Sequence, residues 1–125
     1  MRAVRSRGNR STEKRLRGAL VRTGLRGWIM HPRDIPGTPD FFFPRQGVAV
    51  FIDGCFWHGC PRCGHIPKTN RAYWQGRIQL NQRRDRRNRR RLRNHGIRAI
   101  RFWEHELRAG TEHVLKKLNS LLGQC

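Results

Sequence analysis

The chain has 125 residues, a length that suits one compact domain spanning residues 1–125. Twenty-eight Lys and Arg oppose 8 Asp and Glu, so the formal charge is +20, and no stretch is long and apolar enough to cross a bilayer. Such a charge opposes compaction unless a polyanion neutralises it, and arginine far outnumbers lysine, which favours phosphate binding over a merely solvated basic surface. Nucleic acid is therefore the expected partner, and a membrane protein is excluded.

The first ten residues carry four arginines but no apolar segment, so they do not resemble a secretory signal. We therefore expect the protein in the cytoplasm. Thiols stay reduced there, and clustered cysteines bind metal more often than they form disulfides.

The first expected helix runs from Ser11, a good N-cap, to about Thr23, and Gly24 ends it. Ten residues precede it. On this helix Glu13 shares a face with two leucines, Leu16 and Leu20, and so points inward. The alternative is an acid placed in the first turn to complement the helix dipole.

Strands are expected next. Trp28–His31 forms a short one, and the prolines and glycine of Asp34–Pro39 form a turn. Asp40–Phe43 and Val48–Ile52 then read as a hairpin joined at Pro44–Gly47. Their continuous apolar runs predict strands that are covered on both faces.

The second half begins with a loop, Asp53–Lys68, rich in Cys, His, Gly and Pro. A long helix follows over Thr69–Asn94 and ends before Gly96. Ile97–Trp103 reads as another buried strand and Glu112–Leu122 as a closing amphipathic helix. This order predicts an α/β domain, a mixed sheet flanked by helices.

Three cysteines in the loop have the spacing of a zinc site, Cys55-x4-Cys60-x2-Cys63. Such a site would also stabilise a small basic domain, since zinc binding becomes folding free energy. The alternatives are packed, reduced cysteines or a redox Cys-x-x-Cys pair. A fourth zinc ligand must come from elsewhere, and the candidates are His58, His65 and His105.

Three acids form a second constellation. Asp40 and Asp53 lie at the ends of the paired strands, and Glu13 lies on a covering helix, so all three can converge. Carboxylates of this kind suit Mg²⁺, which would polarise a phosphodiester and help to deliver hydroxide. Each Asp alone is equally consistent with a turn or cap residue.

The arginine-rich helix contains one acid on its apolar face. Asp85 is seven residues from both Ile78 and Leu92, so the three lie together, and His58 is a plausible partner as general base. The alternative is that neighbouring arginines neutralise Asp85. The outward arginines are read as phosphate contacts: Arg83, Arg84, Arg87, Arg90 and Arg91.

Several motifs together resemble the very short patch repair endonuclease family. They are Thr12–Leu16, Pro36–Phe41, Val50–Cys60, Asn81-x3-Asp85-Arg-Arg and Phe102–Glu104. The run Gly-Cys-Phe-Trp-His is the most specific. The resemblance implies the PD-(D/E)XK-type fold of type II restriction enzymes with a zinc-bound loop, and nicking of double-stranded DNA beside T·G mismatches in the bacterial, nucleoid-associated cytoplasm. We expect a monomer.

The resemblance also implies residue roles. Asp40 would be the principal magnesium ligand, assisted by the main chain near Ile52, and His58 the catalytic imidazole supported by Asp85. Glu13 would serve the same site. Some family members carry His where this chain has Asp53. The role of Asp53 is therefore either metal ligation or only the positioning of other groups.

Zinc and DNA contacts follow from the same resemblance. It implies a structural zinc bound by Cys55, Cys60, Cys63 and His105, which it selects over His65. It also implies an aromatic wedge in the base stack, made of Phe56, Trp57 and Trp74. In extended structure Phe56 and Trp57 would point to opposite faces.

Two other functions share parts of this pattern. A zinc base deaminase needs His-x-Glu and Pro-Cys-x-x-Cys, whereas here Pro61 lies inside the cysteine pair. A non-catalytic zinc-stabilised nucleic-acid-binding module fits the charge and the cysteines but leaves the inward acids without a role. A related nuclease that lacks mismatch specificity is the remaining alternative.

Overall fold

The fold is mixed α/β, as predicted. The computed structural model describes residues 2–57, 59–62 and 66–123, with side chains from residue 11 onward. Within these ranges four strands form one sheet in the order β1-β2-β3-β4. The first two pairings are antiparallel and the third is parallel, so the sheet is mixed. Assignment of this sheet to the PD-(D/E)XK type stays a prediction.

The first helix is longer than its sequence pattern indicated. Helix α1 spans Arg2–Arg22, so the residues expected to precede it continue the helix, and Ser11 lies in its interior rather than at its N-cap. Glu13 is therefore well inside the helix, which excludes a first-turn role at the dipole. Its side chain is only 14% exposed, and the neighbouring Leu16 and Leu20 are fully buried, as predicted.

The central strands match the prediction closely. Strand β1 spans Ile29–Met30, β2 spans Phe41–Phe43 and β3 spans Val48–Asp53. Every residue of β2 and β3 is buried, which confirms that both faces of this hairpin are covered. The turn closes with the backbone N–H of Gly47 donating to the carbonyl of Phe43 at 2.8 Å.

The second half adds one helix that the sequence pattern did not reveal. Helix α2 spans Arg71–Asn94, β4 spans Arg98–Trp103 and α4 spans Glu112–Leu122. Helix α3, Glu104–Ala109, was not predicted. Strand β4 lies at the sheet edge and only its Phe102 is buried, so the expectation of a buried strand was wrong.

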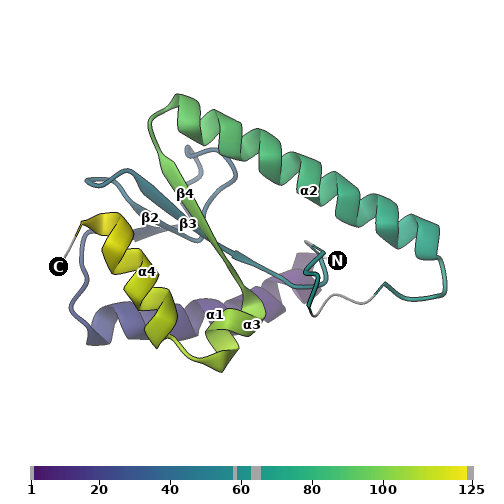
Figure 1. The fold of residues 1–125 in the computed structure, drawn as a ribbon, viewed down its shortest axis with the longest axis horizontal. Coiled ribbons are helices and arrows are strands. Elements are labelled where there is room, and N and C mark those ends of the chain that lie inside the picture. The colour runs from purple at the N-terminus through teal and green to yellow at the C-terminus, as the bar shows by residue number, and fades with distance from the viewer. Residues whose placement is uncertain (1, 58, 63–65, 124–125) are drawn as a thin grey trace.

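Helices cover the two faces of the sheet (Figure 1). On one face, the main core joins α1, α3 and α4 to the sheet through Leu16, Phe41, Val50, Leu107 and Leu118. On the other, a smaller cluster packs Leu92 of α2 against the sheet. The N-terminal turns of α2 extend past the strands (Figure 1). Among the described residues, no helix has the length and apolarity needed to cross a bilayer.

Candidate active site

Asp40 is held in place by the end of strand β3. It precedes β2, where its backbone N–H donates to the carbonyl of Val50 at 2.9 Å. Its Oδ2 accepts a 2.7 Å hydrogen bond from the backbone N–H of Ile52. The N–H and C=O of one strand residue point to the same side of the strand, so the Ile52 carbonyl is also directed toward Asp40. A cation at Asp40 would therefore have a main-chain oxygen on the same side.

Glu13 reaches the same place from helix α1. Its Oε2 lies 2.6 Å from Nε2 of His31, and that nitrogen is 3.8 Å from Oδ1 of Asp40. The ligand atoms of these three residues all lie within 4.8 Å of one another. The two acids are mostly buried, with side chains 14% and 18% exposed, whereas His31 is 49% exposed.

Burial of this carboxylate pair changes the ionisation of Asp40. Burial, together with the hydrogen bond to Glu13 and the charges of Glu13 and Asp53, raises the pKa of Asp40 from 3.8 to about 8, against the lowering effect of the Ile52 N–H. Two neighbouring carboxylates resist ionising together unless a cation compensates them. The donor set of two carboxylates and a main-chain oxygen fits the hard-oxygen preference of Mg²⁺.

The raised pKa makes stability depend on pH in a defined direction. Between pH 3.8 and about 8 the folded protein holds a proton on Asp40 that the unfolded chain has lost, so the free energy of unfolding falls as pH rises through this range. We expect the melting temperature of magnesium-free protein to fall by several degrees more over this interval in the wild type than in Asp40→Asn. Equal slopes in thermal scans of the two proteins would show that Asp40 ionises normally.

The third predicted acid, Asp53, makes a different contact. At the end of β3 it receives two hydrogen bonds from Arg101, from Nε at 2.8 Å and from Nη2 at 3.2 Å. The same Nη2 lies 3.2 Å from Oδ1 of Asp85 on α2. The guanidinium also stacks 4.2 Å from the ring centroid of Phe51. Arg101 therefore joins the two acids, and its single positive charge offsets part of their negative charge.

The predicted imidazole, His58, lies outside the described residues, as does Cys63. The loop on either side of His58 is tied to α2, because the side-chain amide of Asn81 donates to the carbonyl of Trp57 at 2.9 Å. Gly59 has φ of +69°, and a Cβ there would lie 2.7 Å from Nε2 of Gln82. Glycine at this position thus allows the loop to lie against α2.

The three predicted wedge aromatics form one cluster. Ring centroids are 5.1 Å apart for Phe56 and Trp57, 5.5 Å for Phe56 and Trp74, and 5.8 Å for Trp57 and Trp74, all edge-to-face. Phe56 and Trp57 do not point to opposite faces, because residues 55–57 form a turn rather than extended chain. Both are partly buried. Tyr73, which is 59% exposed, extends the cluster through Trp74.

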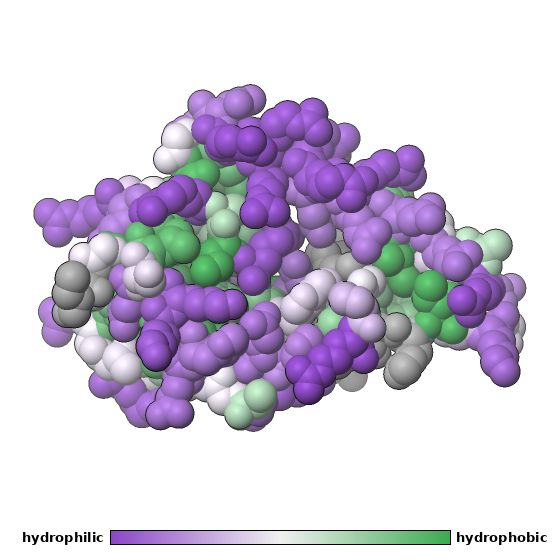
Figure 2. All heavy atoms as spheres, in the orientation of Figure 1, coloured by the Kyte–Doolittle hydropathy of each residue, from purple (hydrophilic) through white to green (hydrophobic). Residues whose placement is uncertain are grey.

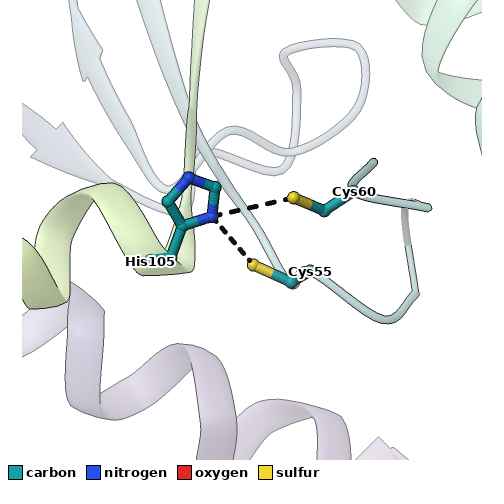
Figure 3. Close-up of side chains that lie close together, drawn as sticks. All are labelled: Cys55, Cys60 and His105. Carbon is teal, nitrogen blue, oxygen red and sulfur yellow. Dashed lines mark hydrogen bonds between the residues drawn. The ribbon is translucent and has the colours of Figure 1, made fainter. Parts of the chain in front are cut away.

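Two cysteines of the loop after β3, Cys55 and Cys60, converge with His105 of α3 (Figure 3). The Nδ1 of His105 lies 3.5 Å from Sγ of Cys55 and 3.7 Å from Sγ of Cys60. Zinc bonds of about 2.3 Å to sulfur and about 2.0 Å to nitrogen, at the tetrahedral angle, separate such ligand atoms by about 3.5 Å. The two sulfur atoms and the nitrogen are therefore spaced like three of the four ligands of a tetrahedral zinc ion.

Helix α3 positions His105 for this cluster. The Oε1 of Glu106 accepts a 2.8 Å hydrogen bond from the backbone N–H of Trp103, which closes the first turn. The backbone N–H of Cys55 donates to Oε1 of Glu104 at 3.1 Å. These contacts connect the start of the loop to the helix that carries the histidine.

Comparison with known proteins places the chain in a family. The model of the DNA mismatch endonuclease Vsr matches residues 1–63. The chain is 41% identical over 109 residues to the type II nicking enzyme V.XorIIP of Xanthomonas oryzae, covering 86% of this chain and 78% of that protein. It is 36% identical over 110 residues to the DNA mismatch endonuclease Vsr of Escherichia coli, covering 86% and 69%. The chain belongs to the Vsr family.

A third relative extends the match. The type II nicking enzyme V.NmeDIP of Neisseria meningitidis is 36% identical over 121 residues, covering 94% of this chain and 80% of that protein. The family resemblance identified from sequence motifs is thereby confirmed. The aligned part of the chain includes the segments that carry Glu13, Asp40 and the cluster of Cys55, Cys60 and His105.

This Vsr family member presents arginines along its long helix. All five arginines predicted to contact phosphate are exposed on α2: Arg83, Arg84, Arg87, Arg90 and Arg91. Hydrophilic side chains cover this helix in the space-filling view (Figure 2). Beside its C-terminal half, further arginines line a groove of about 710 Å³ toward β4 and α4: Arg86, Arg89, Arg93 and Arg98.

Sequence reasoning missed two residues of this site. His31 follows β1, whose Met30 pairs with Phe41, so it lies opposite Asp40 and its backbone N–H donates to the Asp40 carbonyl at 3.3 Å. Arg101 interrupts the apolar run of β4, and a charge in such a strand needs a partner. The charge of Arg101 within an apolar strand was readable from the sequence, whereas the position of His31 opposite Asp40 required the strand register.

Proposed function

We propose that this chain is a magnesium-dependent endonuclease that nicks double-stranded DNA beside a T·G mismatch. The chain is a DNA endonuclease because it belongs to the Vsr family. The magnesium ion and the T·G mismatch are what we propose in addition. The observation that carries the proposal is the buried pair Glu13 and Asp40 at the end of β3. A non-catalytic zinc module would have no use for two buried acids that destabilise each other.

The two acids form the metal site, and the residues around them hold their side chains in place. Asp40 is fixed by the Ile52 N–H, and Glu13 is fixed by α1 and His31. Arg101 fixes Asp53 and Asp85 on the other side of β3. Magnesium bound at Asp40 would polarise the phosphodiester and lower the pKa of a bound water. His58, the residue that follows Trp57 in the sequence, is assigned the proton transfer.

One face of α2 runs from the aromatic cluster to Asp85, which contacts Arg101 beside the end of β3. Trp74, Ile78, Asn81 and Asp85 recur every three or four residues and therefore lie along one side. At 1.5 Å per residue, Trp74 and Asp85 are about 16 Å apart along the helix. A duplex that follows this side of α2 would therefore meet the aromatic cluster and then the end of β3, where Asp85 and Asp53 share Arg101.

Aromatic rings that enter a base stack read its deformability. A mismatched step is easier to unstack than a paired one, so a wedge discriminates through the energy of deformation. The outer arginines of α2 bind phosphates without regard to sequence. Mismatch preference is therefore assigned to the aromatic cluster and affinity to the arginines.

Cleavage of labelled duplexes tests both parts of the proposal. We expect nicking of a T·G duplex with Mg²⁺, none with chelator, and slower nicking of the matched T·A duplex. Trp57→Ala should lower the mismatched-to-matched rate ratio by roughly tenfold, because one stacking contact is worth about 1–3 kcal/mol, and should change the melting temperature little.

Trp28 provides the matched control. Its ring packs edge-to-face on the buried Phe41 at 5.5 Å, so Trp28→Ala should lower stability and preserve the rate ratio. If Trp57→Ala instead lowers stability and keeps the ratio, Trp57 belongs to the core and not to the wedge. Equal cleavage of matched and mismatched duplexes by the wild type would mark a nuclease without mismatch specificity.

A further inference from the structure

The least expected member of the acidic site is a histidine. His31 comes from the turn after β1, Glu13 from α1 and Asp40 from the start of β2, so three separate segments meet. The imidazole Nε2 is 2.6 Å from one carboxylate and 3.8 Å from the other. Since His31 is half exposed and the acids are mostly buried, the ring forms the outer wall of the site.

The backbone holds this ring at a conformational cost. His31 has φ of +50°, in the left-handed region that non-glycine residues rarely adopt, and it precedes a proline, where extended backbone is usual. Its backbone N–H is fixed on the Asp40 carbonyl and its ring on Glu13. Local strain that the surroundings enforce is typical of functional positions.

An octahedral ion with bonds of about 2.1 Å separates adjacent ligand atoms by about 3.0 Å. The separations of 2.6 Å and 3.8 Å from His31 to the two carboxylates lie on either side of that value, within the adjustment of side-chain rotamers. An oxygen-only site suits Mg²⁺, whereas an added imidazole nitrogen favours first-row transition ions.

We propose that His31 is the third ligand of the metal site at Glu13 and Asp40, and that this mixed nitrogen–oxygen set binds Mn²⁺ more tightly than Mg²⁺. The inference rests on the proposed function, because it takes the acidic pair to be the metal centre. It adds a ligand and a metal preference. The competing role for His31 is an ion pair with Glu13 that never contacts the metal.

Direct binding of Mn²⁺ separates these roles without any measurement of cleavage. The aqueous Mn²⁺ signal in electron paramagnetic resonance reports the free ion in DNA-free, zinc-loaded protein, and competition with Mg²⁺ gives the second affinity. We expect wild type to prefer Mn²⁺ by about tenfold or more. His31→Gln should lower Mn²⁺ affinity by about tenfold and change Mg²⁺ affinity much less.

His113→Gln is the matched control, since His113 is also half exposed and its Nε2 lies 3.1 Å from Oε2 of Glu106. It should leave both affinities unchanged, and thermal scans should show both variants folded. Loss of neither affinity in His31→Gln would overturn the ligand role, and equal loss of Mn²⁺ and Mg²⁺ affinity would overturn the metal preference. If Asp40→Asn also retains both affinities, the acidic pair is not the metal centre and the proposed function fails as well.

Discussion

Replacing Asp40 by asparagine is expected to reduce nicking of a T·G duplex by about a thousandfold or more. The change keeps the shape of the side chain and removes the charge that would hold the metal. Metal polarisation supplies several kcal/mol to such a reaction, and each 1.4 kcal/mol corresponds to about a factor of ten in rate. DNA affinity should change little, because binding depends on the arginines exposed along α2.

Single-turnover cleavage and a separate binding titration measure the two effects. Asp34→Asn is the control. Asp34 lies in a turn six residues earlier and is exposed, so this substitution makes the same change of charge away from the site. It should cleave at the wild-type rate. An Asp40→Asn protein that retained cleavage would move the catalytic centre away from the end of β3, and the assignment of Glu13 would fail with it.

The fold was predictable where local pattern determines structure. The apolar runs FFF and VAVFI, with a turn between them, are sufficient to specify a buried hairpin, and β2 and β3 form it. A cap residue is weaker evidence. Ser11 can begin a helix, but it also fits a helix interior at small cost, and the arginine-rich segment before it favours helix. The structure continues α1 back to Arg2.

Helix α3 illustrates a different limit. Its N-cap is Trp103, a residue that carries no capping signal, and the six-residue segment is too short to show a helical period. What stabilises it is Glu106 reaching back to the Trp103 N–H and Leu107 entering the core. The second of these depends on tertiary packing, which sequence pattern alone does not contain.

The candidate site divides in the same way. Helical spacing indicated that Glu13 points inward, because Leu16 and Leu20 identify the buried face, and the extension of α1 back to Arg2 removed the alternative of a first-turn acid. The contacts of His31 and Arg101 depend on strand register, in which Met30 pairs with Phe41 and Phe51 with Arg101. Register is a relation between distant segments, so sequence patterns of single segments do not determine it.

Removal of zinc is expected to lower the melting temperature by about 10 °C or more. Bound metal contributes its binding free energy to folding, and a few kcal/mol in a domain of this size corresponds to a shift of that order. Metal analysis of protein purified without chelator should give about one zinc per chain. Protein that contains no zinc and has the same melting temperature would count against the site.

Replacement of single ligands identifies the fourth corner of the site. His105 enters from α3 with Nδ1 at 3.5 Å and 3.7 Å from the two sulfur atoms, so His105→Ala should lose zinc to a competing chelator much faster than wild type. His65→Ala, which removes a rival ligand candidate on sequence grounds, should retain it.

The zinc cluster is also connected to the loop that carries the aromatic residues, since the Cys55 N–H donates to Glu104, the residue before His105. Loss of the metal would therefore loosen the loop that carries Phe56 and Trp57, and mismatch preference should fall together with stability in His105→Ala. Faster zinc loss from His65→Ala than from His105→Ala would assign the fourth ligand to the loop and separate α3 from the metal.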